Sequence, residues 1–390
     1  MEVLQRTANR GSISTGPYQI DNSLKFERDN SESIVTTTQA AGNQKTWTFS
    51  AWIKRSRLSY DWDNIFGAGT AIIIFNEQDN LIVELYNGTT YKLITNRRFR
   101  DTAAWYHLVV MLDTTQGTAG NRVKIYINGV QETSLSTATY PPQDATFPLG
   151  GQGSSANWIQ LGRFYSGSRH FSGYMADVYY LNGTAEDADA FGETDEDTGI
   201  WIPKAYTGSG YGTQGFHYKF DNASDLGEDS SGEGHNANQK NNISAADQAT
   251  DTPTNNFATT NPLYKYGTET FTTEGATVVT KNANGWVSPQ STICPASGKW
   301  YMEFKFNAVD SRLVGAAPIG GTFWNSAQHY GGTVGSNSVG YADTGYLYVN
   351  DSGVSSNYGP SYDNSNIIAV ALDMDNGYIY WAKDNTWINS

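Results

Sequence analysis

Cysteine is almost absent from this chain, which carries Cys294 alone among 390 residues. A single cysteine cannot form an intrachain disulfide, and it excludes the zinc sites that need several cysteine ligands. We expect Cys294 to be a small buried hydrophobic residue and not a nucleophile, because no histidine stands near it in the sequence. The chain lacks the disulfides of small secreted domains, so we expect it to fold in a reducing compartment.

Long apolar runs and an excess of positive charge are missing as well. No stretch approaches ~18 consecutive apolar residues, so we expect no insertion into a membrane. The opening MEVLQRTANR has no apolar run behind its charges and does not resemble a secretory signal. The net charge of −14 argues against nucleic acid or an anionic membrane as partner. The only basic clusters, KRSR at 54–57 and NRRFR at 96–100, are interpreted as solvated strand ends.

What the chain does contain favours β-structure. It has 40 glycines, 25 tyrosines and 11 tryptophans, and its polarity comes from Gly, Ser, Thr and Asn more than from charge. In TWTFSAWIKR the residues Trp47, Phe49, Ala51 and Ile53 fall on one face of a strand. Short alternating stretches of this kind recur up to about residue 188 and indicate a sandwich or jelly roll.

Asparagine–glycine pairs provide the turn signals. We predict tight hairpin turns at Asn87-Gly88, Asn128-Gly129 and Asn182-Gly183, because a type I′ turn needs positive φ at both central residues. The first and last of these pairs are also Asn-x-Thr sequons. We interpret both sequons as turn chemistry and not as glycosylation sites.

Composition divides the chain into four parts. Residues 1–20 form an arm without periodic pattern, and residues 21–188 form the first β domain. Residues 189–262 are rich in Gly, Asn and Asp but also in aromatics, which predicts an ordered connector packed on its neighbours. Its acidic start at 186–197 fits either a flexible spacer or a short exposed helix. Residues 263–390 begin a second β pattern.

The second β pattern has two strong elements. In SGKWYMEFKF the apolar residues alternate from Trp300 to Phe306. In IIAVALDMDNGYIYWAKDNTW, Ile368, Val370 and Leu372 would face one way before a turn at Asn376-Gly377. An isolated hairpin is marginal in water, so these strands must belong to a larger sheet.

The first domain resembles a known family. TWTFSAWIKR, WYHLVVMLDTT, VKIYINGV, WIQLGR and FSGYMADVYYLNG follow one another in the order and spacing of laminin-G-like, concanavalin A-type jelly rolls. This resemblance implies an all-β fold with a concanavalin A-like (laminin-G-like) jelly-roll sandwich over residues 21–188. The ordered connector follows it.

The last region, from residue 263, resembles the opening of a SPRY-type β-sandwich, whose later strands would lie beyond Ser390 or come from another chain. The whole combination resembles virion structural proteins of tailed bacteriophages, particularly marine ones. That resemblance implies a virion component, such as a tail fibre or capsid appendage, that folds in the cytoplasm of the bacterial host.

Catalytic patterns are weak. The glucanases of this fold carry Glu-x-Asp-x-x-Glu, which sets two carboxylates close together. Here Glu193 and Asp195 begin that motif, but Thr198 stands where its second Glu should be. No Gly-x-Ser-x-Gly elbow occurs in an α/β context. We therefore expect no enzyme activity.

No histidines are paired at metal-ligand spacing, and we expect no cofactor. The laminin-G resemblance allows one metal ion, calcium, because some domains of that family bind it. Residues 60–64 and 225–236 contain clustered oxygen atoms that could act as its ligands. Neither stretch matches an EF-hand, and the second one is more typical of a run of turns.

Two loops carry the side chains that a glycan site needs, which are aromatic platforms beside planar polar groups. The first loop, RLSYDWDN, contains Tyr60, Asp61, Trp62 and Asp63. The second loop, GRFYSGSRHF, contains Arg163, Tyr165, Arg169 and His170. Tyrosine and tryptophan are equally favoured at protein–protein contacts, so a contact with another subunit is an equal interpretation.

The sequence thus predicts a non-enzymatic virion protein that acts in host-surface adhesion and assembly. Its partners would be other virion proteins and a host-surface glycan, and fibre-like relatives suggest a homo-oligomer, with a trimer as the guess. The first alternative is a purely structural capsid decoration or tail joint. The second is a bacterial surface lectin, and an enzyme comes last.

Overall fold

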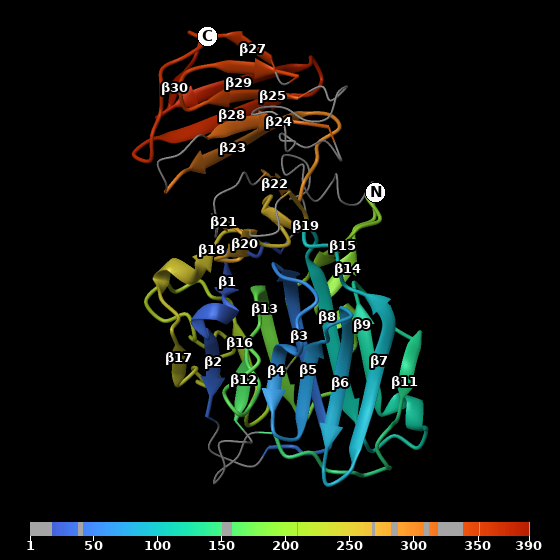
Figure 1. The fold of residues 1–390 in the computed structure, drawn as a ribbon. Helices are drawn as coiled ribbons and strands as arrows, with labels where there is room; N and C mark the ends of the chain where they lie inside the picture. Colours follow the sequence, from blue (N-terminus) through green and yellow to red (C-terminus); the bar gives the residue numbers. More distant parts are fainter. Residues whose placement is uncertain are drawn as a thin grey trace. The chain divides into compact units, whose positions relative to one another are not determined.

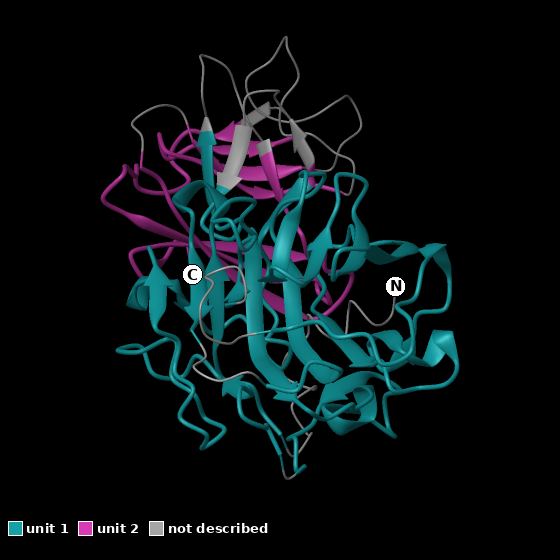
Figure 2. Ribbon diagram, turned by 90° about the horizontal axis from the view of Figure 1, so that it is seen from below, with its two compact units in different colours: residues 1–262, 272–280 teal, residues 263–271, 281–390 magenta. Residues whose placement is uncertain are grey.

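The computed structural model describes residues 18–37, 42–149, 158–208, 210–266, 270–281, 288–307, 312–318, 338–350 and 352–389. The chain forms two compact units (Figure 2): unit 1 takes residues 1–262 and 272–280, and unit 2 takes residues 263–271 and 281–390. The fold is all-β, with 44% strand and 4% helix. Of the expected N-terminal arm, only Tyr18, Gln19 and Ile20 lie within the described residues. No helix in the described ranges has the length and apolar character needed to cross a membrane.

Two eight-stranded antiparallel sheets build unit 1 (Figure 1). Sheet A runs in the order β10-β9-β8-β3-β13-β1-β18, and β16 also pairs with β13. Its strands are β1 (Ser23–Phe26), β3 (Thr46–Arg55), β8 (Tyr106–Asp113), β9 (Val123–Ile127), β10 (Val130–Gln131), β13 (Gly173–Asn182), β16 (Phe216–Tyr218) and β18 (Gln248–Ala249).

Sheet B runs in the order β11-β7-β6-β5-β4-β12-β2-β17. Its strands are β2 (Ser33–Thr36), β4 (Asp63–Ala68), β5 (Ala71–Phe75), β6 (Asn80–Tyr86), β7 (Thr90–Arg98), β11 (Leu135–Ala138), β12 (Ile159–Leu161) and β17 (Gln239–Asn241).

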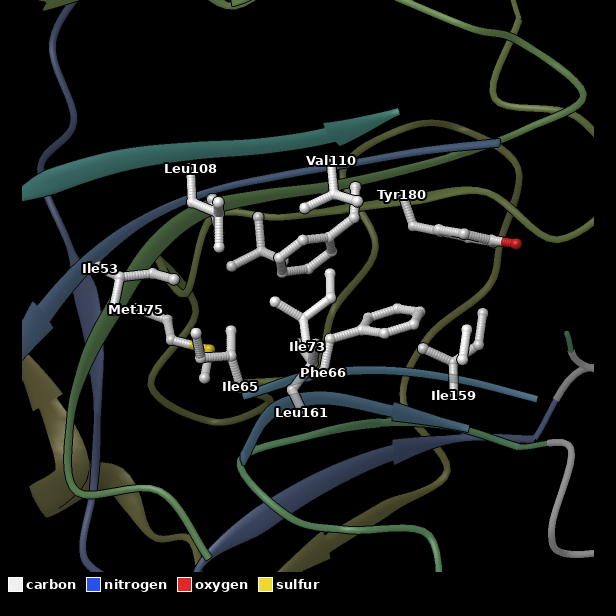
Figure 3. Packing of buried hydrophobic residues seen from close by; sticks show 14 of the residues in the cluster. Ile53, Ile65, Phe66, Ile73, Leu108, Val110, Ile159, Leu161, Met175 and Tyr180 are labelled. Atoms are coloured by element: carbon white, nitrogen blue, oxygen red, sulfur yellow. The ribbon is translucent and has the colours of Figure 1, made fainter. Parts of the chain in front are cut away.

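The core of unit 1 lies between the two sheets. Figure 3 shows Leu108, Val110 and Tyr180 of sheet A opposite Phe66 and Ile73 of sheet B. The alternation predicted for β3 is confirmed, because all four residues that were predicted to share one face belong to this cluster: Trp47, Phe49, Ala51 and Ile53. Burial of these apolar faces is the main force that holds the sandwich closed.

The segment that the sequence sets apart as a connector belongs to unit 1. It supplies β16 to β18 to the sheets, and its short ladder of β14 (Gly192–Thr194) and β15 (Trp201–Pro203) adjoins sheet A. Trp201 stacks on His107 of β8 at 6.0 Å and donates its indole N–H to the Nδ1 of His107 over 3.0 Å. Aromatic residues of this segment therefore cover the outer face of sheet A.

The interpretation of residues 54–57 as a solvated strand end is wrong. Lys54 and Arg55 are fully buried, and Arg57 is 7% exposed. The Lys54 ammonium donates to Asp251, to Asn256 and to the carbonyl of Phe257, all within 2.9 Å. Charged groups can be buried here because each meets its hydrogen-bond partners, a condition that strand periodicity does not reveal.

Arg55 has the same kind of burial. Its guanidinium contacts Asp79 at 3.0 Å and Asp63 at 3.3 Å, and it donates to the carbonyl of Phe99. This buried cluster ties the end of β3 to the start of β4. The other basic stretch, 96–100, is exposed at its three arginines and fits the prediction.

The turn predictions succeed in part. Asn128 and Gly129 have φ of 49° and 80°, as a type I′ turn requires. Asn182 is instead the last residue of β13, and no hairpin follows it. Its side chain accepts from the amide of Asn43 at 2.8 Å and donates to the carbonyl of the same residue. The predicted hairpin at Asn182 is therefore wrong, because a long-range clamp uses this asparagine.

Unit 2 contains two four-stranded sheets, of orders β23-β28-β29-β30 and β24-β25-β26-β27. Ile368, Val370 and Trp381 form part of its core, and Leu372 packs against it, as the hairpin pattern predicts. The strands are β23 (Lys299–Lys305), β24 (Leu313–Ala316), β25 (Val339–Ala342), β26 (Leu347–Val349), β27 (Ser352–Ser355), β28 (Ile367–Asp373), β29 (Tyr378–Lys383) and β30 (Thr386–Trp387).

Short elements complete the description. Two ladders join β19 (Thr260–Tyr266) to β22 (Ser288–Ser291) and β20 (Thr270–Thr273) to β21 (Val278–Lys281). The 3₁₀ turns are η2 (Arg28–Asn30), η3 (Ala119–Asn121), η5 (Ala188–Ala190) and η6 (Ala245–Asp247). Cys294 is exposed and not buried as expected, because it lies in the loop before Pro295 and outside any strand.

Candidate functional site

The first predicted loop connects β3 to β4. Trp62 in this loop has φ of 56°, a conformation that bulky residues adopt only where their surroundings impose it. Its ring packs against Ile72 and Ile74, which face outward from sheet B, and meets Phe164 edge-on at 5.9 Å. The tryptophan therefore lies over the outer face of sheet B.

The second predicted loop follows β12 and crosses the same face. Its base is closed where Gly162 donates to the carbonyl of Ile65 and accepts from the amide of Phe171. Gly67 of β4 makes the crossing possible, because a Cβ there would lie 2.7 Å from the carbonyl oxygen of Arg163. The side-chain amide of Asn64 donates to that same carbonyl and fixes the loop to the sheet.

Both loops meet at one end of the sandwich. The Arg169 guanidinium lies 4.0 Å from the ring centroid of Trp62, which is a cation–π contact between the loops. Arg28 joins them again, because it donates to the carbonyl of His170 and to that of Asp61, each over 3.1 Å. We call the surface formed by residues 28, 60–62 and 163–170 the two-loop surface.

The side chains that solvent reaches on this surface are aromatic and polar. Tyr60 is 41% exposed, and the Arg28 guanidinium lies 4.9 Å from its ring centroid. Tyr165 is half-buried and leans on Phe164 at 4.3 Å. The carboxylate of Asp61 is exposed. These groups offer ring faces, a carboxylate and guanidinium donors to a ligand.

Asp63 does not join this surface. It is 1% exposed, pairs with Arg55 and accepts from the backbone amide of Ser172 at 3.1 Å. Burial raises the pKa of Asp63 to about 6, against the opposing charge of Arg55. Its role is to hold the loop bases together, and sequence spacing could not show this because Arg55 and Ser172 come from other segments.

His170 is also largely covered, at 8% exposure. Burial lowers its pKa below the ordinary histidine value, and the nearby charges of Arg163 and Arg28 lower it further. Its backbone carbonyl is the atom that binds Arg28. Sequence reasoning missed Arg28, because no local pattern links it to the two loops. It also missed Phe164, whose contact with Trp62 joins one loop to the other.

Each stretch considered for calcium has a carboxylate that is already engaged, and in the first stretch it is Asp63, which pairs with Arg55. The Asp229 carboxylate accepts from the backbone amides of His217, Ser231 and His235, so it organises the turns of its own region. Within the described ranges, no three or more His, Cys, Asp or Glu residues are grouped so that they could hold a metal ion.

The glucanase-like residues have a turn role. The Asp195 carboxylate accepts from the amide of Thr198 at 2.7 Å and from its hydroxyl at 2.6 Å, which closes the tight turn after β14. The threonine that breaks the motif thus makes a local structural contact.

Comparison with known proteins agrees with the fold. Residues 28–190 match the laminin G family model that is described as the concanavalin A-like lectin/glucanases superfamily. The jelly roll of unit 1 is therefore a laminin-G-like, concanavalin A-like domain, as the resemblance predicted. A search among curated proteins finds no match to this sequence.

Solved structures with similar folds share little sequence. A Bacteroides ovatus protein to which carbohydrate binding is ascribed is 18% identical, with a TM-score of 0.39 over 57% of this chain and 59% of its own. Domain 4 of the arabinanase AbnA from Geobacillus stearothermophilus, solved with arabinotriose, is 22% identical, with a TM-score of 0.28 over 37% of this chain and 64% of its own. Mouse laminin α1 domains LG4-5 are 8% identical, with a TM-score of 0.35 over 97% of this chain and 79% of their own.

Proposed function

We propose that this protein is a non-enzymatic component of a tailed-phage particle, displayed on a tail fibre or capsid appendage, that recognises a glycan on the host surface. One observation carries the recognition half of the proposal: two loops far apart in sequence meet as a single surface of aromatic rings and guanidinium groups. The domain that holds them has the lectin-type fold.

The chemistry of this surface suits a sugar. Aromatic rings bind the apolar faces of pyranose rings, while planar donors and acceptors hold hydroxyl groups. The exposed parts of Tyr60 and Tyr165 supply the rings, and Asp61 supplies an acceptor. Trp62 and Arg169 pack on each other and so join the two loops that carry these groups.

The virion assignment rests on the sequence resemblance and on the SPRY-like character proposed for unit 2. Display in many copies would make a weak single-site contact strong, because each later contact becomes effectively intramolecular. A homo-oligomer, with a trimer as the working model, would provide such copies.

An assembly role is the second candidate, and one feature of unit 2 favours it. The outer face of β23, β29 and β30 exposes Tyr301, Tyr378, Tyr380 and Trp387, each by 43% or more. Exposed aromatic faces of this kind are typical of protein–protein contacts. In this alternative the particle uses the chain as a joint or decoration that binds no sugar.

Binding to host polysaccharide separates the two candidates. Tyr60→Ala and Tyr165→Ala should each weaken binding of the purified protein to immobilised host-surface glycan by about tenfold or more, as loss of a contact aromatic does. Tyr86→Ala is the matched control, because Tyr86 is 50% exposed at the end of β6 that lies away from the two-loop surface. Equal binding by all four proteins would contradict the proposed site.

Location on the particle tests the virion half. Antibody-gold labelling of purified phage should mark tail fibres or the tail tip if the protein is an adhesin. Label over the capsid would favour the decoration role. Absence of label on intact, accessible particles would contradict display and favour a bacterial lectin.

A further inference from the structure

The positive charge of the two-loop surface is offset only at longer range, because Arg28 acts on the carboxylates of Asp29 and Asp63 without an ion pair to either. Among the described residues, no carboxylate lies within ion-pair distance of Arg28, Arg163 or Arg169. The neighbouring arginines behave differently, since Arg55 pairs with two aspartates and Arg57 with Asp29 and Glu27. In a chain of net charge −14, with carboxylates in excess, three unpaired guanidinium groups at one end stand out.

Among these three arginines, Arg163 most clearly lacks a neutralising partner. Its side chain is half-buried, and burial lowers its pKa from the ordinary value. One donor, Nε, meets the side-chain oxygen of Gln160 at 2.5 Å, and the described residues provide no acceptor for its two terminal nitrogens. A partly desolvated guanidinium lacks the compensation that buried cations usually find in a carboxylate.

The three charges act on one region. Arg163 and Arg28 both lower the pKa of His170, so the positive potential of each reaches the same imidazole. Arg28 also binds the carbonyl of Asp61, beside the Trp62 ring that Arg169 covers. Within the residues of the two-loop surface, the exposed carboxylate of Asp61 is the one negative group. The net charge of that surface is therefore positive.

We infer that the two-loop surface selects acidic sugars, with the carboxylate or sulfate of the sugar held by the terminal nitrogens of Arg163 and supported by the charge of Arg28. This inference rests on the proposed glycan recognition and narrows its ligand class. A guanidinium presents paired N–H donors that match the two oxygens of a carboxylate. The ring of the same sugar then lies against the exposed face of Tyr165 or Tyr60.

The test uses matched pairs of polymers that differ only in charge. Binding of the full chain is measured to polygalacturonate and its methyl ester, and to dextran sulfate and dextran. We expect at least tenfold tighter binding to one or both charged members, with a steep loss of affinity as salt increases. Preference for polygalacturonate alone identifies the carboxylate as the recognised group, and preference for dextran sulfate alone identifies the sulfate.

Substitutions at Arg163 test whether this residue binds the acidic group of the polymer. Arg163→Gln should abolish the preference for the acidic polymer, and Arg163→Lys should restore part of it because the charge returns without the paired donors. Arg122→Gln is the control, since Arg122 lies at the other end of the sandwich, where it donates to the carbonyls of Gln116 and Gly117 in the β8–β9 loop and to that of Pro141 after β11. Circular dichroism and melting temperature confirm that each variant is folded.

Failure of the inference differs from failure of the proposed function. Equal binding of charged and neutral polymers, unchanged in Arg163→Gln, would overturn acid selection and leave glycan recognition standing. An acid preference that survives Arg163→Gln would also overturn the assigned site. If none of these polymers nor the host-surface glycan binds, the glycan-recognition proposal falls together with the inference.

Discussion

Acid should weaken the attachment of the connector to sheet A, because His107 is buried there as a neutral imidazole. Its ring is 1% exposed and stacks between Trp52 at 4.8 Å and Trp201 at 6.0 Å. Nδ1 accepts from the indole of Trp201, which leaves the proton on Nε2 to be donated to Ser50 over 2.9 Å. Burial lowers the pKa of His107 to about 3.

The size of this acid destabilisation follows from the linkage between protonation of His107 and folding. An unfolded chain binds this proton near the ordinary histidine pKa of about 6.5, whereas the folded chain binds it only near 3. The contribution of His107 is thus fully present above the unfolded pKa and is lost as the pH falls toward the folded one. Well below the unfolded pKa, each pH unit in this window costs about 1.4 kcal/mol of unfolding free energy. Between pH 6.5 and 4.5 the loss is about 2.3 kcal/mol, because the slope is only half as steep at pH 6.5.

His107→Gln isolates this effect. Glutamine can accept from Trp201 and donate to Ser50, but it does not titrate. Urea unfolding followed by tryptophan fluorescence gives the free energy of both proteins at several pH values between about 7 and 4.5. Asp63, whose raised pKa gives the opposite pH dependence, is present in both proteins and cancels in the difference.

The stability advantage of the wild type over His107→Gln should shrink by about 1.4 kcal/mol per pH unit below pH 6. A difference that stays constant across the range would refute the reasoning, because it would mean that His107 is not held neutral by its surroundings.

Three further substitutions test packing. Lys54→Met should destabilise unit 1 by about 3–5 kcal/mol in urea unfolding, because it leaves the buried Asp251 carboxylate without its cation. A decrease of less than about 1 kcal/mol in the free energy of unfolding would contradict this. Gly67→Ala should shift the loop after β12, because the added Cβ meets the carbonyl of Arg163. We expect glycan binding to weaken at least several-fold, with less than about 3 kcal/mol lost in the free energy of unfolding. Unchanged affinity would argue that the position of this loop does not matter for binding. Gly129→Ala combines a φ of 80° with a Cβ 2.4 Å from the Trp201 ring, so its melting temperature should drop, and a neutral result would disprove the close approach.

The strands were predictable because their evidence is local. The alternation around Trp47 and that around Val370 place the correct side chains in the two cores, since a strand has a fixed period of two. The turn at Asn128-Gly129 was predictable for the same reason: both φ values follow from the residues themselves.

Predictions failed where a residue is governed by a distant partner. Lys54 looked like a solvated strand end, but its three acceptors lie about two hundred residues along the chain, where no periodicity can reveal them. Asn182 looked like a hairpin turn, but its amide binds Asn43. In both cases a long-range hydrogen bond overrode a correct local preference.

The sequence alone determined that this protein is an all-β chain with a laminin-G-like jelly roll, because the alternation of apolar residues and the order of its motifs are local properties. It also marked the two loops that carry aromatic and guanidinium side chains. Only the tertiary structure decided that these loops meet, that Asp63 is withdrawn into a buried ion pair, and that Arg28 completes the surface. The reason is physical: sheet register and burial bring together segments that lie far apart in the chain, and the charge that each side chain meets depends on that assembly.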